Sequence, residues 1–436
     1  MKFSKLLLAM AASGIATSAF ATNGYFAHGI GVKAKAMGGA SIAFAEDGFG
    51  AAANPANLAQ VKDGYSVGVS AFAPDRGVGA TSGWAGASGA AAGTYAGNEA
   101  ADAFAIPEFA YKKAYNDKIN WGVVVYGNGG MNVDYGRPMY AASTNTSSNL
   151  EQLFIAPTVS YKLNDQHAVA ASLNLVYQNF KATGLDWFNQ YTSAATTSAY
   201  NQNTPLNPWT YLGNGVNPGD HGVDDSTGVG IRLGWLGKLT DAVSAGAFYQ
   251  PKTSMDKFTA YKDLFAQGGG FDIPETYGVG IAVKASPKTS VALDVVQINY
   301  GGIKSLANPN SHNPNNTDLG AEDGKGFGWS DMTVYKLGVA HQLDDKTTIR
   351  AGWNYGKQPI SKGQLDFNLL APAVVEHHIT LGMTRALDKD SEFSMSLMYA
   401  PNVELTGTSA DGSGTSYMSK LEMSQIEIGV QYSKKF

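Results

Sequence analysis

Residues 423–436, at the carboxyl end of the chain, read MSQIEIGVQYSKKF and alternate between two kinds of side chain. One parity is largely apolar and the other is polar or small: Ile426, Ile428, Val430 and Tyr432 against Gln425, Glu427, Gly429, Gln431 and Ser433. A period of two is that of a β-strand, whose successive side chains point to opposite faces. Such a strand has one apolar face, which either a soluble β-sandwich or a membrane barrel could use. The rest of the chain decides between them.

The same alternation recurs from about Gly64 onward in segments of roughly 10 to 16 residues. We expect strands over 64–73, 104–115, 118–130, 151–163, 166–182, 225–238, 241–255, 271–285, 288–302, 329–343, 346–356, 375–388, 391–404 and 421–436. Fourteen is an even number, as is usual for single-chain bacterial outer-membrane barrels. The pattern therefore predicts an all-β fold, a 14-stranded antiparallel transmembrane β-barrel over residues 61–436.

The connections between these segments alternate in length. Short ones such as LNDQ (163–166) and LDDK (343–346) are rich in the Asn and Asp residues that favour tight turns. The longest cover about 74–103 and 183–224. Short turns at one end and long loops at the other are typical of outer-membrane barrels, where closure leaves no strand edge unpaired in hydrocarbon. A secreted β-sandwich or adhesin, the alternative, would have similar strands without this regular alternation.

The amino terminus predicts export. Two lysines precede an apolar run over residues 6–15, and residues 19–21 read AFA, a cleavage signal. The run is too short to cross a bilayer as a helix. We expect residues 1–21 to be a cleaved signal peptide, a mature chain that begins at Thr22, and a destination in the Gram-negative outer membrane.

The composition excludes some classes of protein. Removing the two signal lysines from the 31 basic residues leaves 29 against 36 acidic ones, a net charge of −7 that argues against a nucleic-acid partner. Only 15% of residues are charged, whereas a soluble chain normally has about 25%. The chain has no cysteine, so an exported protein of this size is held together without disulfides.

Residues 22–60 are rich in Gly and Ala and lack the strand alternation. A wide barrel leaks unless its lumen is filled, and small residues permit close backbone packing against a wall. We expect this segment to form an N-terminal hatch inside the barrel, with Asn54, Pro55 and Ala56 as a turn that brings the chain to the periplasmic rim. A flexible periplasmic tail is the alternative.

Several strings resemble the FadL-type family of outer-membrane transporters, which carry long-chain fatty acids, aromatic hydrocarbons and other hydrophobic compounds. Residues 23–59, NGYFAHG to ANLA, resemble the family's hatch with its Asn-Pro-Ala motif at 54–56. Residues 255–300 resemble its fourth extracellular loop and the two following strands, and IRAGWNYGKQPI (349–360) and the aromatic C-terminus also match. The resemblance spans the mature chain. It implies a monomeric, passive channel for hydrophobic small molecules in outer-membrane lipid, without a cofactor.

In that family, loops three and four form a groove that captures substrate. An apolar groove would hold an acyl chain, since each buried methylene contributes about 0.8 kcal/mol. Residues 258–265 have the apolar spacing of a short helix, which Gly268–Gly270 would end. The expected substrate-binding groove comprises Leu185, Trp187, Phe188, Phe258, Tyr261, Leu264 and Phe265, with Trp209 and Tyr211 beside them. Alternatively, these side chains only pack the loops together.

An exit is expected in the third strand. Gly127, Gly129 and Gly130 interrupt it, and glycine there permits a bulge or bend. The family has an inward kink at this strand that opens a lateral gate in the wall. An ordinary strand-to-loop transition is the alternative reading of these glycines.

Charged side chains of inward parity could face a substrate carboxylate. In the expected register these are Arg232, Lys284, Lys336 and Arg350, and each could equally pair with a lumenal acid such as Asp294. A slip of one residue would reverse their orientation.

No motif for catalysis or metal binding is evident in the sequence. His377 and His378 are adjacent, so on a strand they face opposite sides and would not chelate one ion. The Asn- and Asp-rich stretch 308–326 lacks EF-hand spacing. We therefore expect no enzyme activity, no metal and no cofactor.

Phe436, an aromatic end on an alternating strand, would be recognised by the barrel assembly machinery. A general diffusion porin or a structural surface barrel remains the alternative function.

Overall fold

The computed structural model describes residues 22–80, 93–97, 103–136, 144–185, 220–310, 319–410 and 416–436. The expected signal peptide and the candidate groove residues Trp187, Phe188, Trp209 and Tyr211 lie outside these ranges.

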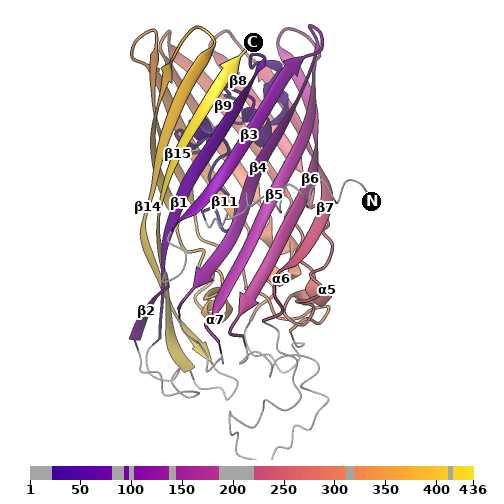
Figure 1. The fold of residues 1–436 in the computed structure, drawn as a ribbon, viewed down its shortest axis with the longest axis vertical. Helices are drawn as coiled ribbons and strands as arrows, with labels where there is room; N and C mark the ends of the chain where they lie inside the picture. The colour runs from indigo at the N-terminus through magenta and orange to yellow at the C-terminus, as the bar shows by residue number, and fades with distance from the viewer. Residues whose placement is uncertain are drawn as a thin grey trace, which may run out of the picture.

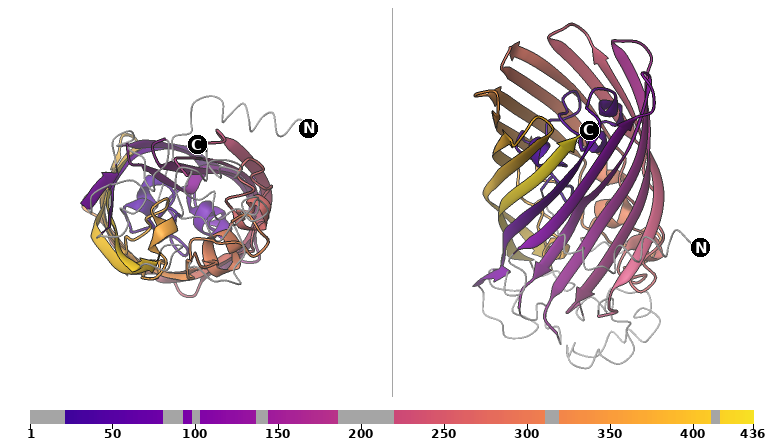
Figure 2. Two further views of the ribbon diagram at one scale, coloured as in Figure 1. Left: turned by 90° about the horizontal axis from the view of Figure 1, so that it is seen from below. Right: turned by 45° about the horizontal axis from the view of Figure 1, so that its top comes forward.

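One antiparallel sheet closes on itself as a barrel (Figures 1 and 2). Its strands are β1 (Gly64–Ala80), β2 (Gly93–Gly97), β3 (Phe104–Ala114), β4 (Ile119–Asp134), β5 (Ser147–Lys162), β6 (His167–Thr183), β7 (Asp224–Lys238), β8 (Val243–Gln250), β9 (Thr276–Ser286), β10 (Thr289–Ile298), β11 (Met332–Gln342), β12 (Thr347–Gly356), β13 (His377–Ala386), β14 (Ser391–Ala410) and β15 (Ser416–Lys435).

The wall of the barrel has fourteen strands. Of the 15 strands in the sheet, β2 pairs only with the last residues of β1, at Arg76–Ala80. The remaining strands follow one another in chain order, and β15 pairs with β1 from Gly64↔Lys435 to Ala80↔Ser419. The predicted 14-stranded antiparallel barrel is therefore confirmed. We call the end with the tight turns, at the top of Figure 1, the turn end, and the opposite end the loop end.

The outer surface of the wall is apolar, whereas its inner surface carries polar side chains as well as apolar ones. On β7, Val229 is 62% exposed, whereas Asn174 on the neighbouring β6 is 1% exposed and points into the lumen. This is the reverse of a soluble protein, and it is the arrangement of a barrel whose outer face contacts lipid. The expected parity of the strands is thus correct.

The helices within the described ranges are short. They are α2 (Val32–Lys35), α3 (Gly50–Ala53), η1 (Pro55–Ala59), α5 (Ala266–Gly269), η5 (Tyr300–Gly302), α6 (Lys304–Ala307) and α7 (Leu365–Asn368). Within the described ranges, no helix is long and apolar enough to span a membrane.

The helix expected over 258–265 is wrong. This segment runs in consecutive turns, with hydrogen bonds from Tyr261 N to Phe258 O and from Leu264 N to Tyr261 O, and α5 begins only at Ala266. The reason is a tertiary contact that overrides local propensity. Phe258 N donates to Gly269 O across the segment, so its two ends are held together and a straight helix cannot form.

Residues 22–61, drawn in indigo, lie inside the ring of strands (Figure 2). We call residues 22–60 the N-terminal segment. Most of its side chains are buried, and α2 contacts β13, β14 and β15 while η1 contacts β4 to β7. The segment therefore touches opposite sides of the wall, nearer to the turn end than to the loop end (Figure 1).

Candidate functional site

The wall holds the N-terminal segment by hydrogen bonds to its backbone. Asp294 on β10 accepts from the N–H groups of Ser41 and Ile42 with one carboxylate oxygen, at 2.7 and 3.0 Å. Asn54 is buried and donates through Nδ2 to Ile42 O and to Trp235 O of β7, both at 2.9 Å. Asn54 Oδ1 accepts from Ala56 N at 3.1 Å, so the Asn-Pro-Ala stretch starts η1 and also ties it to the wall.

Ion pairs anchor the same segment. Arg350 on β12 donates to both carboxylate oxygens of Glu46, at 2.8 and 2.7 Å. Burial disfavours the ionised form of Glu46, but the Arg350 guanidinium outweighs it and holds the pKa of this carboxyl below its usual value. Lys35 lies 3.0 Å from Glu108 and 2.8 Å from Glu427, and all three are buried. Breaking one partner of such a buried pair costs about 3–5 kcal/mol.

Two of the four candidate lumenal cations hold this segment. Arg350 is paired with Glu46, and Lys336 donates to His28 O at 3.0 Å. Lys284 is exposed near the turn end. Arg232 is buried, donates to Gln250 Oε1 at 3.1 Å and lies over the Phe248 ring, 5.0 Å from its centroid. The adjacent histidines face opposite sides as expected, His378 buried and His377 exposed.

Aromatic rings from the start of the N-terminal segment and from segments next to β9, β10 and β11 pack together in the lumen. We call Tyr25, Phe26, Phe271, Tyr300 and Trp329 the lumenal ring cluster. Tyr25 is central, with ring centroids 4.9 Å from Phe26, 5.5 Å from Tyr300, 6.0 Å from Phe271 and 6.2 Å from Trp329. Tyr300 Oη donates to Asn23 O at 2.5 Å, which fixes the start of the chain against η5.

A second group of rings lies at the loop end. We call Phe180, Phe258, Tyr261 and Phe265 the loop ring cluster. The Phe180 centroid is 4.7 Å from both Tyr261 and Phe265 and 5.9 Å from Phe258. Tyr261 Oη accepts from Ala182 N at 3.0 Å and donates to Gly222 O at 2.6 Å. These rings thus join residues 258–265 to the end of β6.

The candidate groove residues within the described ranges are buried rather than open to solvent. Leu185, Phe258 and Tyr261 have no exposed surface, and Leu264 and Phe265 have 5% and 3%. The candidate residues that the structure describes therefore form no open groove in this conformation, because Phe258, Tyr261 and Phe265 pack against Phe180. Their role in binding a substrate stays a prediction.

The two clusters are connected. Phe265 of the loop ring cluster lies 5.0 Å from Phe271 of the lumenal ring cluster, and Phe271 contacts Tyr25. Tyr25 contacts Phe26 in turn. A continuous series of buried rings therefore runs from beneath the loops to Phe26 in the lumen.

Phe26 lies at an irregularity in the wall. β3 and β4 pair only over Phe109–Ala114 and Asn120–Val125. Beyond this point, among the strands that the structure describes, β3 pairs with β1 and β4 pairs with β5, but β3 and β4 do not pair with each other. The register of β4 against β5 also shifts between Gly127 and Gly129, which leaves Asn128 as an extra residue. We call this the β3–β4 gap, and it contains all three glycines expected to bend the strand.

The N-terminal segment occupies the inner side of this gap. Phe26 and Gly129 form an isolated antiparallel bridge, Ala27 N donates to Asn128 O at 2.9 Å and Gly130 N donates to Tyr25 O at 3.0 Å. A Cβ on Gly129 would lie 1.9 Å from Tyr25 O, so only glycine permits this approach. β4 thus pairs with Tyr25–Ala27 where it lacks β3.

Sequence reasoning missed the lumenal ring cluster. Phe271, Tyr300 and Trp329 fall at or near the ends of the strands expected over 271–285, 288–302 and 329–343, whereas in the structure they lie outside β9, β10 and β11. Tyr25 and Phe26 lie in residues 22–60, where the many Gly and Ala residues led to a prediction of close backbone packing rather than of an aromatic cluster. One signal could have identified these residues. It is an aromatic residue that lies outside the strand alternation and next to Gly, as in NGYF (23–26).

A closed barrel with an apolar outer wall is the architecture of an outer-membrane protein, and its filled lumen distinguishes it from an open pore. A family model described as "Outer membrane protein transport protein (OMPP1/FadL/TodX)" matches residues 8–436. The chain belongs to this family, and the resemblance expected from the sequence is confirmed. It is therefore a protein of the Gram-negative outer membrane whose family transports hydrophobic compounds. Its turn end faces the periplasm and its loop end the cell exterior.

Solved structures share the fold at low sequence identity. The Pseudomonas putida toluene transporter TodX is 18% identical, with 94% of this chain and 99% of that chain covered and a TM-score of 0.67. A Pseudomonas aeruginosa FadL homologue is 15% identical, with coverage of 95% and 100% and a TM-score of 0.70. The Ralstonia pickettii toluene transporter TbuX is 19% identical, with coverage of 94% and 99% and a TM-score of 0.63. Among curated protein sequences, none matches this chain significantly.

Proposed function

We propose that this protein is a passive channel for hydrophobic compounds, such as long-chain fatty acids or hydrocarbons, that enter at the loop end and leave sideways through the β3–β4 gap. The observation that carries the proposal is the continuous series of buried rings from Phe265 to Phe26, which ends at the gap. A hydrophobic molecule that displaced these contacts would stay in apolar surroundings along its whole path.

The physical advantage of a sideways exit is that the molecule never crosses water. Each methylene group transferred from water to an apolar site is favoured by about 0.8 kcal/mol, so an acyl chain in the lumen would not leave readily into the periplasm. Release between β3 and β4 delivers it directly to membrane hydrocarbon. Because Tyr25–Ala27 occupy the gap, we propose that these residues must move before the substrate leaves.

The relatives support a hydrophobic cargo. TodX and TbuX are toluene transporters, and another structural neighbour, CymD, is a monoaromatic hydrocarbon channel (TM-score 0.58). We propose a cargo of the same general kind here, in a monomeric barrel without enzyme activity.

We also propose that the barrel assembly machinery recognises Phe436, which is 63% exposed at the turn end.

A general diffusion porin or a purely structural barrel is the competing function. The interior argues against the porin, because residues 22–60 fill the lumen and are tied to β7, β10 and β12 by Asn54, Asp294 and Arg350. We propose that this segment acts as a hatch. Its many contacts with the wall favour the hatch over a flexible tail.

Uptake and conductance together test the proposal. Cells that lack other uptake routes would express either the full chain or a variant without residues 22–45, and would receive labelled oleate or toluene. We expect uptake with the full chain and near-zero ion conductance in planar bilayers. The deletion should abolish selective uptake and raise conductance, while heat-modifiable gel mobility shows that the barrel still folds. Large conductance of the full chain, or unchanged uptake after the deletion, would refute the proposal.

A further inference from the structure

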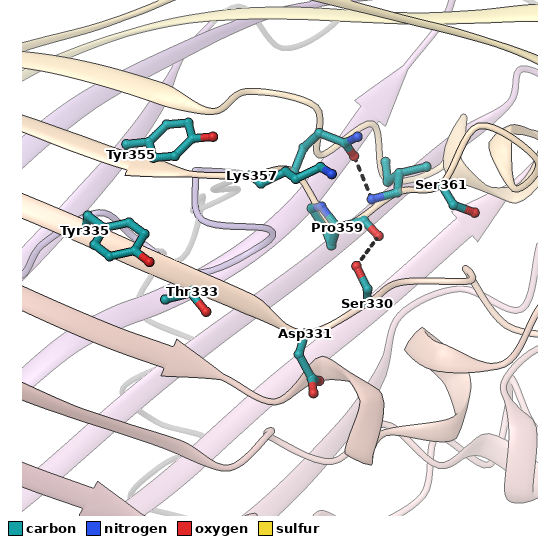
Figure 3. A pocket seen from close by; sticks show the side chains of 10 residues that line it. Ser330, Asp331, Thr333, Tyr335, Tyr355, Lys357, Pro359 and Ser361 are labelled. Atoms are coloured by element: carbon teal, nitrogen blue, oxygen red, sulfur yellow. Dashed lines mark hydrogen bonds between the residues drawn. The ribbon is translucent and has the colours of Figure 1, made fainter.

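A hollow of about 450 Å³ lies at the surface of the barrel, and none of its lining residues belongs to the lumenal ring cluster or to the β3–β4 gap (Figure 3). It is formed where β11 begins and β12 ends, at the loop end. Its lining comprises Ser330, Asp331, Thr333, Tyr335, Tyr355, Lys357, Gln358, Pro359, Ile360 and Ser361. Tyr335, which lines it, is 47% exposed, and it shares its outward parity with the lipid-facing residues of β11. The hollow therefore opens on the surface that meets the membrane at its outer boundary.

Stacked rings form one side of this hollow. Tyr355 lies parallel to Trp353, with centroids 5.8 Å apart and an angle of 4°, and to Tyr335, at 6.5 Å and 16°. His377 on β13 stacks on Tyr355 at 4.7 Å and accepts a hydrogen bond from Trp353 Nε1 at 3.1 Å. These contacts lock the rings in place. Aromatic rings near the end of such a barrel lie at the level of the lipid headgroups. There the apolar face of a ring contacts apolar groups while its polar atoms form hydrogen bonds.

The hollow also offers a free cation. Lys357 is exposed, and among the residues that the structure describes no carboxylate lies within ion-pair distance of its Nζ. Asp331 is the carboxylate on the lining, and its Oδ1 accepts from Gly301 N at 2.7 Å, on the side of η5. Figure 3 shows Lys357 between the two tyrosines and the Pro359–Ser361 segment. A lysine ammonium is well suited to bind a phosphate oxygen as a point charge.

We propose that this hollow binds the phosphorylated sugar headgroup of a glycolipid in the outer leaflet, with the phosphate on Lys357 and a sugar ring beside Tyr335 and Tyr355. Three observations converge on this occupant. The site includes Tyr335, which shares the outward parity of β11, it lies at the loop end of two wall strands, and it combines flat ring faces with hydroxyl groups and an unpaired cation. Acyl chains of the same lipid would continue down the exposed apolar face of β11 and β12, past Leu337 and Ala351.

Native mass spectrometry of the detergent-purified full chain, titrated with bisphosphorylated lipid A, tests the proposal. We expect saturable binding that weakens at least tenfold with Lys357→Ala and with dephosphorylated lipid A. Lys389→Ala is the matched control, because Lys389 is 90% exposed at the turn end, and it should leave binding unchanged. Asp331→Asn should keep or tighten binding. Heat-modifiable gel mobility confirms that each variant folds.

Two results would overturn the proposal. Equal binding by Lys357→Ala and the unsubstituted chain would show that the lipid associates only through its acyl chains. Displacement of lipid A by inorganic phosphate at the same concentration would show a simple anion site in which the rings play no part.

Discussion

Phe26 and Gly129 pair as an isolated antiparallel bridge, and this contact joins the start of the described chain to the part of β4 that lacks a β3 partner. The bridge replaces a missing strand: two hydrogen bonds flank it, from Ala27 N to Asn128 O and from Gly130 N to Tyr25 O. Tyr25–Ala27 thus connect the lumenal ring cluster to the β3–β4 gap. Movement of Tyr25–Ala27 would change both at once.

Gly129→Val should displace Tyr25–Ala27 from β4. The added Cβ would lie 1.9 Å from Tyr25 O, and loss of the two flanking hydrogen bonds costs about 2 kcal/mol, roughly a 30-fold shift toward the displaced state. We expect faster amide hydrogen exchange at Ala27 and Gly130, whose N–H groups donate the two flanking hydrogen bonds. Gly302→Ala is the control, since a Cβ there meets nothing within 4 Å. Identical exchange in Gly129→Val and the unsubstituted chain would show that the substitution does not release Tyr25–Ala27 from β4.

Glu46→Gln should loosen the N-terminal segment from the wall. The substitution leaves Arg350 buried without its carboxylate partner, at a cost of about 3–5 kcal/mol. We expect faster proteolysis of residues 22–60 in the folded barrel and higher ion conductance. The double variant Glu46→Gln with Arg350→Met should recover part of the loss because no unpaired charge remains. No difference between single and double variants would argue that the pair is not an anchor.

Phe271→Ala should interrupt the path between the two ring clusters. Phe271 is fully buried and contacts both Phe265 and Tyr25, so its loss removes about 3–5 kcal/mol of packing. The barrel wall does not depend on it. We expect uptake of a labelled hydrophobic probe to fall at least tenfold with unchanged heat-modifiable mobility. Trp121→Ala, on the lipid-facing side of β4, is the matched control and should retain uptake.

Acidification should weaken the docking of the N-terminal segment through His28. Burial, opposed in part by nearby Glu427, lowers the pKa of His28 from 6.5 to about 4. The docked state therefore holds this imidazole neutral, and its advantage is complete above pH 6.5 and declines as the pH falls from 6.5 toward 4. We expect conductance to rise across this window and His28→Gln to flatten the rise. A rise of equal size in His28→Gln would assign the effect to other groups.

The sequence predicted the wall better than the interior. Alternation defines a strand and its lipid face within a few residues, because lipid selects apolar side chains at every second position. It identified the strands and the inward parity of Arg232 and Arg350. It could not assign Arg350 to Glu46 or Asp294 to Ser41, because such contacts depend on how the N-terminal segment folds within the lumen.

Loop structure was predicted least well. The spacing over 258–265 favours a helix, yet Phe258 and Gly269 close the segment into turns. The periodicity of a sequence shows which residues share one face of an element, but it does not show which other segment packs against that face. The glycines at 127–130 were a better guide, since Gly129 is required by a close backbone approach that no other residue allows.

The most direct test of the account is to fix Tyr25–Ala27 to β4 and measure uptake. The chain has no cysteine, so Ala27→Cys with Asn128→Cys introduces one possible disulfide. These positions lie opposite each other beside the Phe26–Gly129 bridge, at the spacing an antiparallel pair gives a disulfide. The account predicts that uptake of labelled oleate or toluene falls at least tenfold in the oxidised protein and returns on reduction. Equal uptake in the oxidised and reduced states would contradict a sideways exit through the β3–β4 gap.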